Sequence, residues 1–149
     1  VNSLLESVYN LFNEVKEVEL TLSMPDKVLN VFADKNHLVS VFNNIIKNAI
    51  QAIPEGRTDG LIDVSLIESD GKAVVKISDN GSGISDDMKD KVFVPNFTTK
   101  SSGTGLGLAI SKNIIESVDG AIYFETEVGE GTDFFVTLPI ISVDELVPA

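Results

Sequence analysis

The chain has 149 residues and a mass of 16.0 kDa, a size typical of one domain that can bury its own core. It has no cysteine, which excludes disulfides and thiolate metal sites, and it has no apolar run of the roughly 20 residues that a membrane span needs. The formal net charge of −12 opposes binding to nucleic acid or to an anionic membrane, unless basic side chains gather on one face.

The first half of the chain predicts two helices and four strands. The chain begins at Val1 rather than Met, so we expect a fragment of a longer protein. Apolar residues at helical spacing predict a first helix, and Asp34 is a suitable N-cap for a second one that ends before Pro54. Two short strands joined around Met24-Pro25-Asp26 are predicted first, and alternating apolar residues then predict a second pair, joined by a hairpin-type turn. The expected ranges are helices at 3–14 and 35–53, strands at 18–23, 28–33, 61–67 and 73–78, and a loop at 54–60.

The second half predicts a short polar helix at 85–91, a helix from 104 or 105 to 118, and strands at 121–126 and 134–138. Gly120 is the C-cap signal of the longer helix. This order of elements favours an α+β fold, in which helices cover one face of a single mixed sheet. We expect one domain over residues 1–140 and a tail or linker over 141–149.

The helix expected over 35–53 carries two asparagines about one turn apart. At roughly 100° per residue, Asn44 and Asn48 lie about 40° apart, at the border between the apolar and polar stripes of the helix. They are either surface amides or a pair of neutral oxygens at the edge of a cleft, suited to hold Mg²⁺ or a water molecule beside phosphates. Magnesium needs only one or two protein ligands where phosphates supply the others. The helix alone leaves both interpretations open.

Asp79 ends a predicted strand and is followed by two glycines, Gly81 and Gly83. An Asn-Gly hairpin turn is the common interpretation of such a segment, but a polar helix pattern follows here instead of a strand. A carboxylate at a strand end could accept a hydrogen bond from an exocyclic amine. The glycines would then let a flat ring lie against the backbone.

The segment Phe93-Val94-Pro95-Asn96-Phe97-Thr98-Thr99-Lys100 contains two phenylalanines and a lysine. It is either a loop that the phenylalanines pin to the core or a lid that closes over a ligand and supplies Lys100 to phosphate. The segment by itself favours neither. It lies within residues 91–115, which contain no Asp or Glu and would tolerate a small anionic ligand.

Three alternating glycines, Gly103, Gly105 and Gly107, come directly before an apolar helical segment. Glycine is costly to order, so they indicate either a flexible connector or a backbone that approaches a ligand closely. The Walker A pattern is absent, and Leu108 stands where the third glycine of the Rossmann pattern is required. What remains is a glycine-flanked helix start, whose free N–H groups and positive dipole end form an anion site.

The order of these four segments resembles a known family. An Asn-x-x-x-Asn helix, a strand ending in D-x-G-x-G, an F-x-P-x-F segment and a G-x-G-x-G helix start are similar to the N, G1, F and G2 boxes of the ATP-binding catalytic domain of bacterial sensor histidine kinases. That domain belongs to a superfamily with gyrase-type and chaperone-type ATPases. The likeness runs from about Asp34 to Pro139. It implies the Bergerat fold, a two-layer α/β sandwich with a mixed, mostly antiparallel sheet and a mobile ATP lid.

The resemblance implies roles for individual residues. Asp79 would bind the adenine amino group, while Gly81, Gly83 and Thr132 would form the base pocket. Asn48 would hold Mg²⁺, Lys47 would lie near the phosphates, and Asn44 would position or polarise the reacting group. Lys100 and the N–H groups of Gly103, Thr104, Gly105 and Gly107 would hold the phosphate tail. The other residues expected to contact the nucleotide are Gln51, Ile84, Phe97, Thr98, Leu106 and Leu108.

The residue at position 44 bears on the reaction. Hydrolysing members of the superfamily and stand-alone serine kinases typically carry Glu there, as a base. An amide cannot remove a proton at neutral pH, whereas a histidine imidazole is already nucleophilic and needs no such base. Asn44 therefore favours transfer of the γ-phosphate of Mg-ATP to histidine over hydrolysis. Catalysis would then consist mainly of positioning and charge neutralisation.

The family's acceptor histidine lies on a helical hairpin that precedes the ATP domain, but the single histidine here is His37, at the start of the N-box helix. We interpret His37 as a partly exposed helix residue, so the phosphoacceptor is absent from this fragment. The implied partners are the upstream dimerisation and histidine-phosphotransfer domain of the same protein and a response regulator. The fragment is expected to be a cytoplasmic monomer from a homodimeric parent; whether that parent is an inner-membrane sensor is left open.

Two alternatives remain at this point. One is a stand-alone serine kinase or ATPase on the same fold. The other is a non-catalytic, degenerate interaction domain that keeps the fold but has lost the nucleotide.

Overall fold

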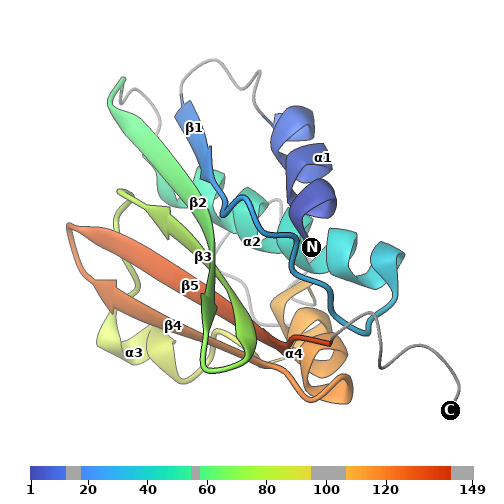
Figure 1. The fold of residues 1–149 in the computed structure, drawn as a ribbon. Coiled ribbons are helices and arrows are strands. Elements are labelled where there is room, and N and C mark those ends of the chain that lie inside the picture. The colour runs from blue at the N-terminus through green and yellow to red at the C-terminus, as the bar shows by residue number, and fades with distance from the viewer. Residues whose placement is uncertain (13–17, 55–57, 95–106, 142–149) are drawn as a thin grey trace, which may run out of the picture.

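The computed structural model describes residues 1–12, 18–54, 58–94 and 107–141. It is a two-layer α/β sandwich, with helices packed against a twisted sheet (Figure 1), as the sequence predicts. The elements in chain order are α1 (Asn2–Phe12), β1 (Val18–Ser23), α2 (Lys35–Ala52), β2 (Gly60–Ser69), β3 (Lys72–Asp79), α3 (Asp86–Lys89), α4 (Gly107–Ser117), β4 (Ala121–Glu127) and β5 (Gly131–Pro139).

The strands described form one sheet in the order β1-β2-β3-β5-β4. The edge pair β1–β2 is parallel and the other three pairs are antiparallel, so the sheet is mixed and mostly antiparallel. In the β3–β5 ladder, Asp79 pairs with Thr132. The register thus brings the last residue of β3 beside a residue that is distant in sequence but that the resemblance assigns to the same pocket.

The sheet buries one face. Along β2, Ile62, Val64 and Leu66 are buried, whereas Leu61 and Ile67, which point to the other face, are exposed. This alternation follows from the two-residue period of a strand. The fold therefore needs a helical layer on only one side of the sheet.

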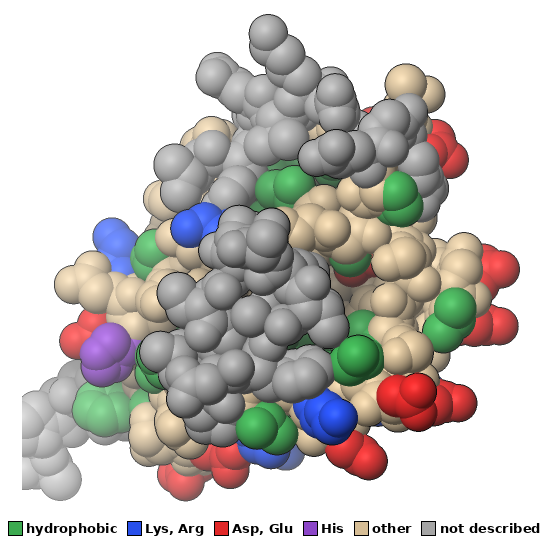
Figure 2. All heavy atoms as spheres, turned by 180° about the vertical axis from the view of Figure 1, so that it is seen from behind, with side chains coloured by type: hydrophobic (Ala, Val, Ile, Leu, Met, Phe, Trp, Pro, Cys, Tyr) green, Lys and Arg blue, Asp and Glu red, His purple; other side chains and the backbone are tan. Residues whose placement is uncertain are grey.

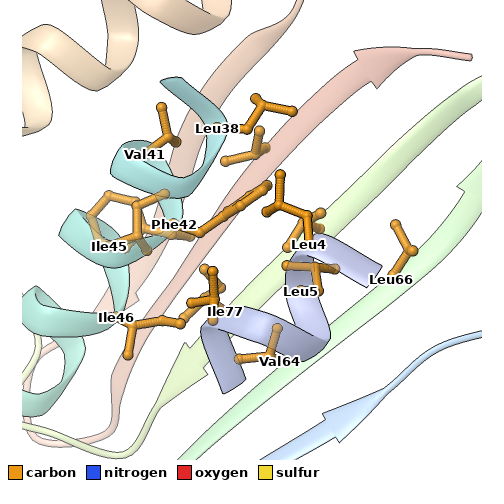
Figure 3. Close-up of a cluster of buried hydrophobic side chains, with 14 of the residues drawn as sticks. Leu4, Leu5, Leu38, Val41, Phe42, Ile45, Ile46, Val64, Leu66 and Ile77 are labelled. Atoms are coloured by element: carbon orange, nitrogen blue, oxygen red, sulfur yellow. The ribbon is translucent and has the colours of Figure 1, made fainter. Parts of the chain in front are cut away.

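The core lies between that face and the helices α1 and α2. Figure 3 shows Phe42 of α2 and Leu5 of α1 in one buried cluster with Val64 and Leu66 of β2. Phe42 has no exposed surface and Leu5 is 1% exposed. Since each buried side chain of this size contributes roughly 1.5–3 kcal/mol, this layer fixes the position of α2 on the sheet.

Helix α2 begins and ends where the sequence predicts. The Asp34 carboxylate accepts hydrogen bonds from the backbone N–H groups of Asn36 (2.8 Å) and His37 (3.2 Å), which satisfies two donors of the first turn. The helix ends at Ala52 because the residue before Pro54 is biased towards an extended conformation. These two signals set the length of the helix that carries both candidate asparagines.

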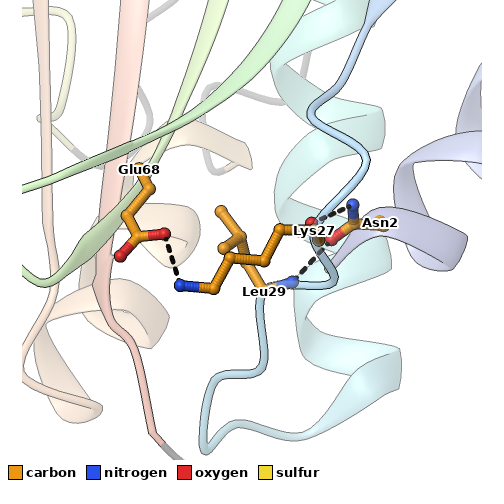
Figure 4. A network of polar contacts seen from close by, with 4 residues as sticks. All are labelled: Asn2, Lys27, Leu29 and Glu68. Carbon is orange, nitrogen blue, oxygen red and sulfur yellow. Dashed lines mark hydrogen bonds and ion pairs between the residues drawn. The ribbon is translucent and has the colours of Figure 1, made fainter.

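The strand predicted over 28–33 is wrong. Apart from an isolated bridge at Val31, this segment has no strand pairing. The Asn2 side chain instead accepts from the N–H of Leu29 (2.9 Å) and donates to the carbonyl of the preceding Lys27 (3.1 Å), as Figure 4 shows. The carbonyl of Leu29 accepts from the N-terminal ammonium of Val1 (3.1 Å). The Lys27 side chain forms an ion pair with Glu68 of β2, with 3.0 Å between Nζ and Oε2. The apolar residues of this segment thus mark a chain that buries Leu29 and leaves Val28 and Phe32 exposed, and not a ladder.

The end of α4 also differs from the prediction. Asp119, not Gly120, adopts the left-handed conformation, with φ of 62°. The N–H of Gly120 bonds to the carbonyl of Ile115 (2.9 Å) and so closes the helix. A Cβ atom on Gly120 would lie 2.4 Å from the carbonyl oxygen of Thr137. This glycine is therefore needed for the close approach of the chain to β5, and not for a positive φ.

Within the described ranges, no helix is both long and apolar enough to cross a membrane. Acidic side chains lie around the rim of the face seen in Figure 2, in keeping with the net charge of −12. The boundary between a domain and a tail at residue 140 stays a prediction, because residues 142–149 lie outside the described part of the chain.

Candidate functional site

A cavity of about 510 Å³ opens between the C-terminal half of α2, the segment after β3 and the adjoining ends of β4 and β5. The sequence prediction and the cavity overlap at Asn48, Gln51, Asp79, Gly83, Ile84, Leu108 and Thr132. The structure adds Ala52, Ser82, Ser85, Met88, Val92, Val128 and Phe134 to the lining. The predicted residues from four separate segments, α2, the end of β3 with its following loop, α4 and β5, therefore meet at one hollow.

Asp79 is the carboxylate of this cavity. It is 7% exposed and its Oδ1 accepts a hydrogen bond from the N–H of Gly81 (2.9 Å). That bond turns the chain sharply after β3 and holds the carboxylate against the cavity wall. Because Asp79 is also paired with Thr132 in the sheet, its position is fixed from both sides.

The two glycines after Asp79 are required by the protein itself. A Cβ atom on Gly81 would lie 2.5 Å from the carbonyl oxygen of Ala52, and the N–H of Ser82 bonds to that same oxygen (3.0 Å). Gly83 has φ of +78°, and a Cβ atom there would lie 2.4 Å from the carbonyl oxygen of Glu127. The segment is thus pressed between the end of α2 and the β4–β5 turn, a reason for glycine that is additional to room for a flat ring.

Thr126 is a site residue that the sequence analysis missed. Its Oγ1 accepts from the N–H of Ile84 (2.9 Å), lies 2.8 Å from the hydroxyl of Thr132 and donates to the carbonyl of Gly131 (3.1 Å). It therefore joins the loop after β3 to the start of β5. No spacing in the sequence pointed to it, because the link arises from the pairing of β4 with β5.

The two asparagines of α2 have different surroundings, and only Asn48 is among the residues that line the cavity. Asn48 lines the cavity, and its Nδ2 donates to the carbonyl of Asn44 (3.0 Å). Asn44 is half-buried against α4, where its Nδ2 lies 3.3 Å from the carbonyl oxygen of Gly107 and 3.3 Å from Oγ of Ser111. Lys47 is exposed and is not among the residues that line the cavity.

An aromatic cluster borders the cavity. The ring of Phe93 lies 6.0 Å from that of Phe124 and 6.5 Å, edge-on, from that of Phe134, which lines the cavity. The Lys112 ammonium lies 5.1 Å from the Phe93 ring centroid. The first phenylalanine of the 93–100 segment thus pins that end to the sheet layer. Residues 95–100 of the segment lie outside the described residues, so the choice between pinned loop and lid stays open.

Several predicted site residues fall in the part of the chain that the structure does not describe. They are Phe97, Thr98, Lys100, Gly103, Thr104, Gly105 and Leu106. Gly107 is the first residue of α4 and lies against Asn44. The predicted phosphate-binding group is therefore represented here only by its last glycine.

The two cavities near the site differ in the number of carboxylates that line them. A second cavity, of about 430 Å³, is lined by six carboxylates, which are Asp63, Asp79, Glu125, Glu127, Glu130 and Asp133. In the first cavity, Asp79 is the one carboxylate among the described lining residues. Among the described residues, no group of three or more acidic, histidine or cysteine side chains could hold a metal ion.

One titratable group near the site has a shifted pKa. The Asp86 carboxyl in α3 has its pKa lowered, first by a hydrogen bond from Lys89 and then by the attraction of the same ammonium. The Nζ–Oδ1 distance is 2.8 Å. Because Asp86 is fully exposed, this pair belongs to the surface beside the cavity and not to its interior.

Comparison with known proteins identifies the family. Residues 33–142 match the family model described as histidine kinase-, DNA gyrase B-, and HSP90-like ATPase. Sporulation kinase D of Bacillus subtilis (strain 168) is 40% identical over 131 residues, which cover 88% of this chain and 25% of that protein. Sensor histidine kinase ZraS of Escherichia coli (strain K12) is 38% identical over 125 residues, which cover 84% of this chain and 26% of that protein.

A solved structure of similar extent agrees with these matches. The nucleotide-free catalytic domain of histidine kinase ThkA superposes with a TM-score of 0.81 at 33% identity, over 93% of this chain and 91% of that one. The chain spans about a quarter of the length of the two curated relatives (25% and 26%). The chain therefore belongs to the histidine kinase-, DNA gyrase B- and HSP90-like ATPase family, as an ATPase domain of the sensor histidine kinase type.

Proposed function

We propose that this chain binds Mg-ATP and donates the γ-phosphate to a histidine on a separate dimerisation domain of a two-component sensor kinase. The observation that carries the proposal is the cavity itself. Its lining combines a buried carboxylate, Asp79, and an amide of α2, Asn48, with apolar side chains. Such a site offers a polar contact to each end of a nucleotide and apolar contact to its base.

The base would lie at the Asp79 end. The carboxylate would accept a hydrogen bond from an exocyclic amine, as adenine provides and guanine does not at the corresponding position. Oδ1 of Asp79 already accepts from Gly81, so the same carboxylate serves both the loop and the ligand. Met88 and Phe134, which line the cavity, would contact the flat faces of the ring.

The phosphates would lie at the α2 end, towards the start of α4. Asn48 would contribute an amide oxygen to Mg²⁺, and the missing cluster of acidic or histidine ligands among the described residues suits a metal whose other ligands are phosphate oxygens. When bound, Mg²⁺ neutralises charge on the phosphates. Lys47, Lys100 and the backbone N–H groups around Gly103–Gly107 would complete the anion site.

Asn44 would position the reacting group without acting as a base, because an amide does not take up a proton near neutral pH. This favours a nucleophile such as an imidazole over water or a serine hydroxyl. The acceptor would come from the upstream dimerisation domain of the same protein, and a response regulator would receive the phosphoryl group. We further propose that the isolated domain is a cytoplasmic monomer and that its parent is a homodimer.

The proposal is tested with radiolabelled ATP and this chain, with and without the upstream segment of its parent protein. The expected product is acid-labile, base-stable label that forms only with that segment present. Steady ATP hydrolysis by the chain alone, lost in Asn44→Ala, would favour the ATPase or serine kinase. No thermal shift with millimolar Mg-ATP or Mg-ADP would favour the non-catalytic interaction domain.

A further inference from the structure

The amide of Asn44 lies against the first turn of α4. Its Nδ2 is 3.3 Å from the carbonyl oxygen of Gly107 and 3.3 Å from Oγ of Ser111. A carbonyl oxygen only accepts hydrogen bonds, so the group that faces it must be the amide NH₂. The Oδ1 atom of Asn44 is therefore the end of the amide turned away from these two partners.

The hydroxyl of Ser111 enforces the same orientation. Ser111 has no exposed surface, and its hydroxyl donates to the carbonyl of Gly107 (2.8 Å), four residues earlier in the helix. With its single proton used there, Oγ can only accept from Asn44. A flipped amide would place its oxygen against two acceptors, so this pair of contacts selects one orientation.

Gly107 also packs against the side-chain amide of Asn44. A Cβ atom at this position would lie 3.3 Å from Cγ of Asn44, 3.4 Å from Oδ1 and 3.5 Å from Nδ2. The three distances are nearly equal, so the glycine backbone faces the flat side of the amide. The Asn44 amide thus donates to two acceptors, the Gly107 carbonyl and the Ser111 hydroxyl, and the backbone of Gly107 packs against its flat face.

From this geometry we infer that Ser111 is a positioning residue for phosphoryl transfer: it holds the Asn44 amide so that Oδ1, and not Nδ2, is presented to the reacting group. The inference rests on the proposed function and assigns a part in it to a residue that no sequence motif marked. An outward Oδ1 can accept a hydrogen bond from the N–H of an acceptor imidazole and keep its other nitrogen directed at the phosphate. An outward NH₂ only donates hydrogen bonds, so it cannot accept one from the imidazole N–H.

The decisive comparison is between Ser111→Ala and Ser117→Ala in the complete kinase that contains this chain. Ser117 is a matched control, because its hydroxyl also bonds back into α4, to the carbonyl of Ile114 (2.6 Å), but is exposed and makes no contact with Asn44. Ser111→Ala should slow single-turnover histidine phosphorylation about 3- to 10-fold, as expected for one lost neutral hydrogen bond, with KM for ATP within about twofold. Ser117→Ala should change neither.

A purely structural role is separated from positioning by repeating Ser111→Ala in an Asn44→Ala background. If Ser111 acts through the amide, the second substitution produces no further loss of rate. An equal loss in both backgrounds, or a raised KM with an unchanged rate, would overturn the inference. Ser111→Thr, which keeps the hydroxyl, should retain more activity than Ser111→Ala, and the reverse order would also count against it.

A measurement on this chain alone tests the contact without any activity. In the nuclear magnetic resonance spectrum of the Asn44 side-chain amide, Ser111→Ala should shift both proton signals and speed their exchange with water, and Ser117→Ala should leave them unchanged. Unshifted signals would overturn the inference. Failure of the proposed function has a different signature: the wild-type kinase would form no phosphohistidine although the amide signals respond as expected, and the part assigned to Ser111 in transfer would fall with it.

Discussion

The two ends of the cavity are built in different ways. At the base end, backbone meets backbone: Gly83 lies against the carbonyl of Glu127, and Gly81 against that of Ala52. At the α2 end, side-chain amides define the site, with Asn48 bonded to its own helix and Asn44 bonded to α4. Where backbone packs on backbone, a single added atom has no room. Where side-chain amides form the site, a residue can be substituted without moving the helix. Substitution of these glycines should therefore affect folding, whereas substitution of the asparagines should affect binding or chemistry.

The largest effect is expected at Gly83. Gly83→Ala must strain a residue at φ +78° and push its Cβ to 2.4 Å from a backbone oxygen, so unfolding in urea should show a loss of at least about 3 kcal/mol. Gly129→Ala is the matched control, since Gly129 has φ of +86° with nothing within 4 Å of the added Cβ. It should lose only about 1–2 kcal/mol. Equal losses at the two positions would show that the close approach to the Glu127 carbonyl adds nothing to the cost at Gly83.

The second effect concerns ligand binding at the same end. Asp79→Asn keeps an oxygen for the Gly81 N–H but removes the charge-assisted bond to the base, so ADP affinity should fall by about 1.5–3 kcal/mol, roughly 10- to 150-fold, in calorimetry. Asp133→Asn, on the acidic cavity of the other sheet face, serves as control and should leave affinity unchanged. If both variants bind equally well, Asp79 is not the base carboxylate.

A smaller effect is expected at the α2 end. Asn48→Ala should weaken ADP binding about fivefold with Mg²⁺ present, about 1 kcal/mol, and less than twofold with the metal chelated, because only the metal contact is lost. Its stability should change little, since the side chain is not part of the core. Asn113→Ala, on an exposed position of α4, is the control. Equal losses with and without metal would argue against Asn48 as a ligand.

The smallest effect is a pH dependence at α3. Lys89 holds the pKa of Asp86 below its ordinary value by a hydrogen bond and by its charge, so the folded state favours the ionised carboxyl. The small stability that this pair contributes is present above the unfolded-state pKa and is lost as pH falls through the lowered folded-state pKa. Titration of the Asp86 carboxyl in wild type and in Lys89→Gln should show the pKa rise in the variant. An unmoved titration would remove Lys89 as the cause.

Local signals in the sequence predicted most elements correctly because the interactions behind them are local. The Asp34 cap, the alternation along β2 and the D-x-G-x-G turn each depend on neighbours within a few residues. The failed strand at 28–33 shows the limit of this approach. Its residues are mostly apolar, but the backbone of Leu29 bonds to the Asn2 side chain and to the N-terminal ammonium of Val1, and no spacing rule predicts these partners.

The candidate site shows the same difference between local and long-range information. By itself the sequence determined that a carboxylate, two helix asparagines and a glycine-flanked helix start occur in a fixed order, and this order led to the family. Only the tertiary structure decided which of them meet. The β3–β5 register places Asp79 beside Thr132, β4 supplies Thr126 to join them to Ile84, and the packing of α2 on α4 sets Ser111 against Asn44. These contacts join residues far apart in the chain, so they depend on the packing of the whole core and are not encoded in any one motif.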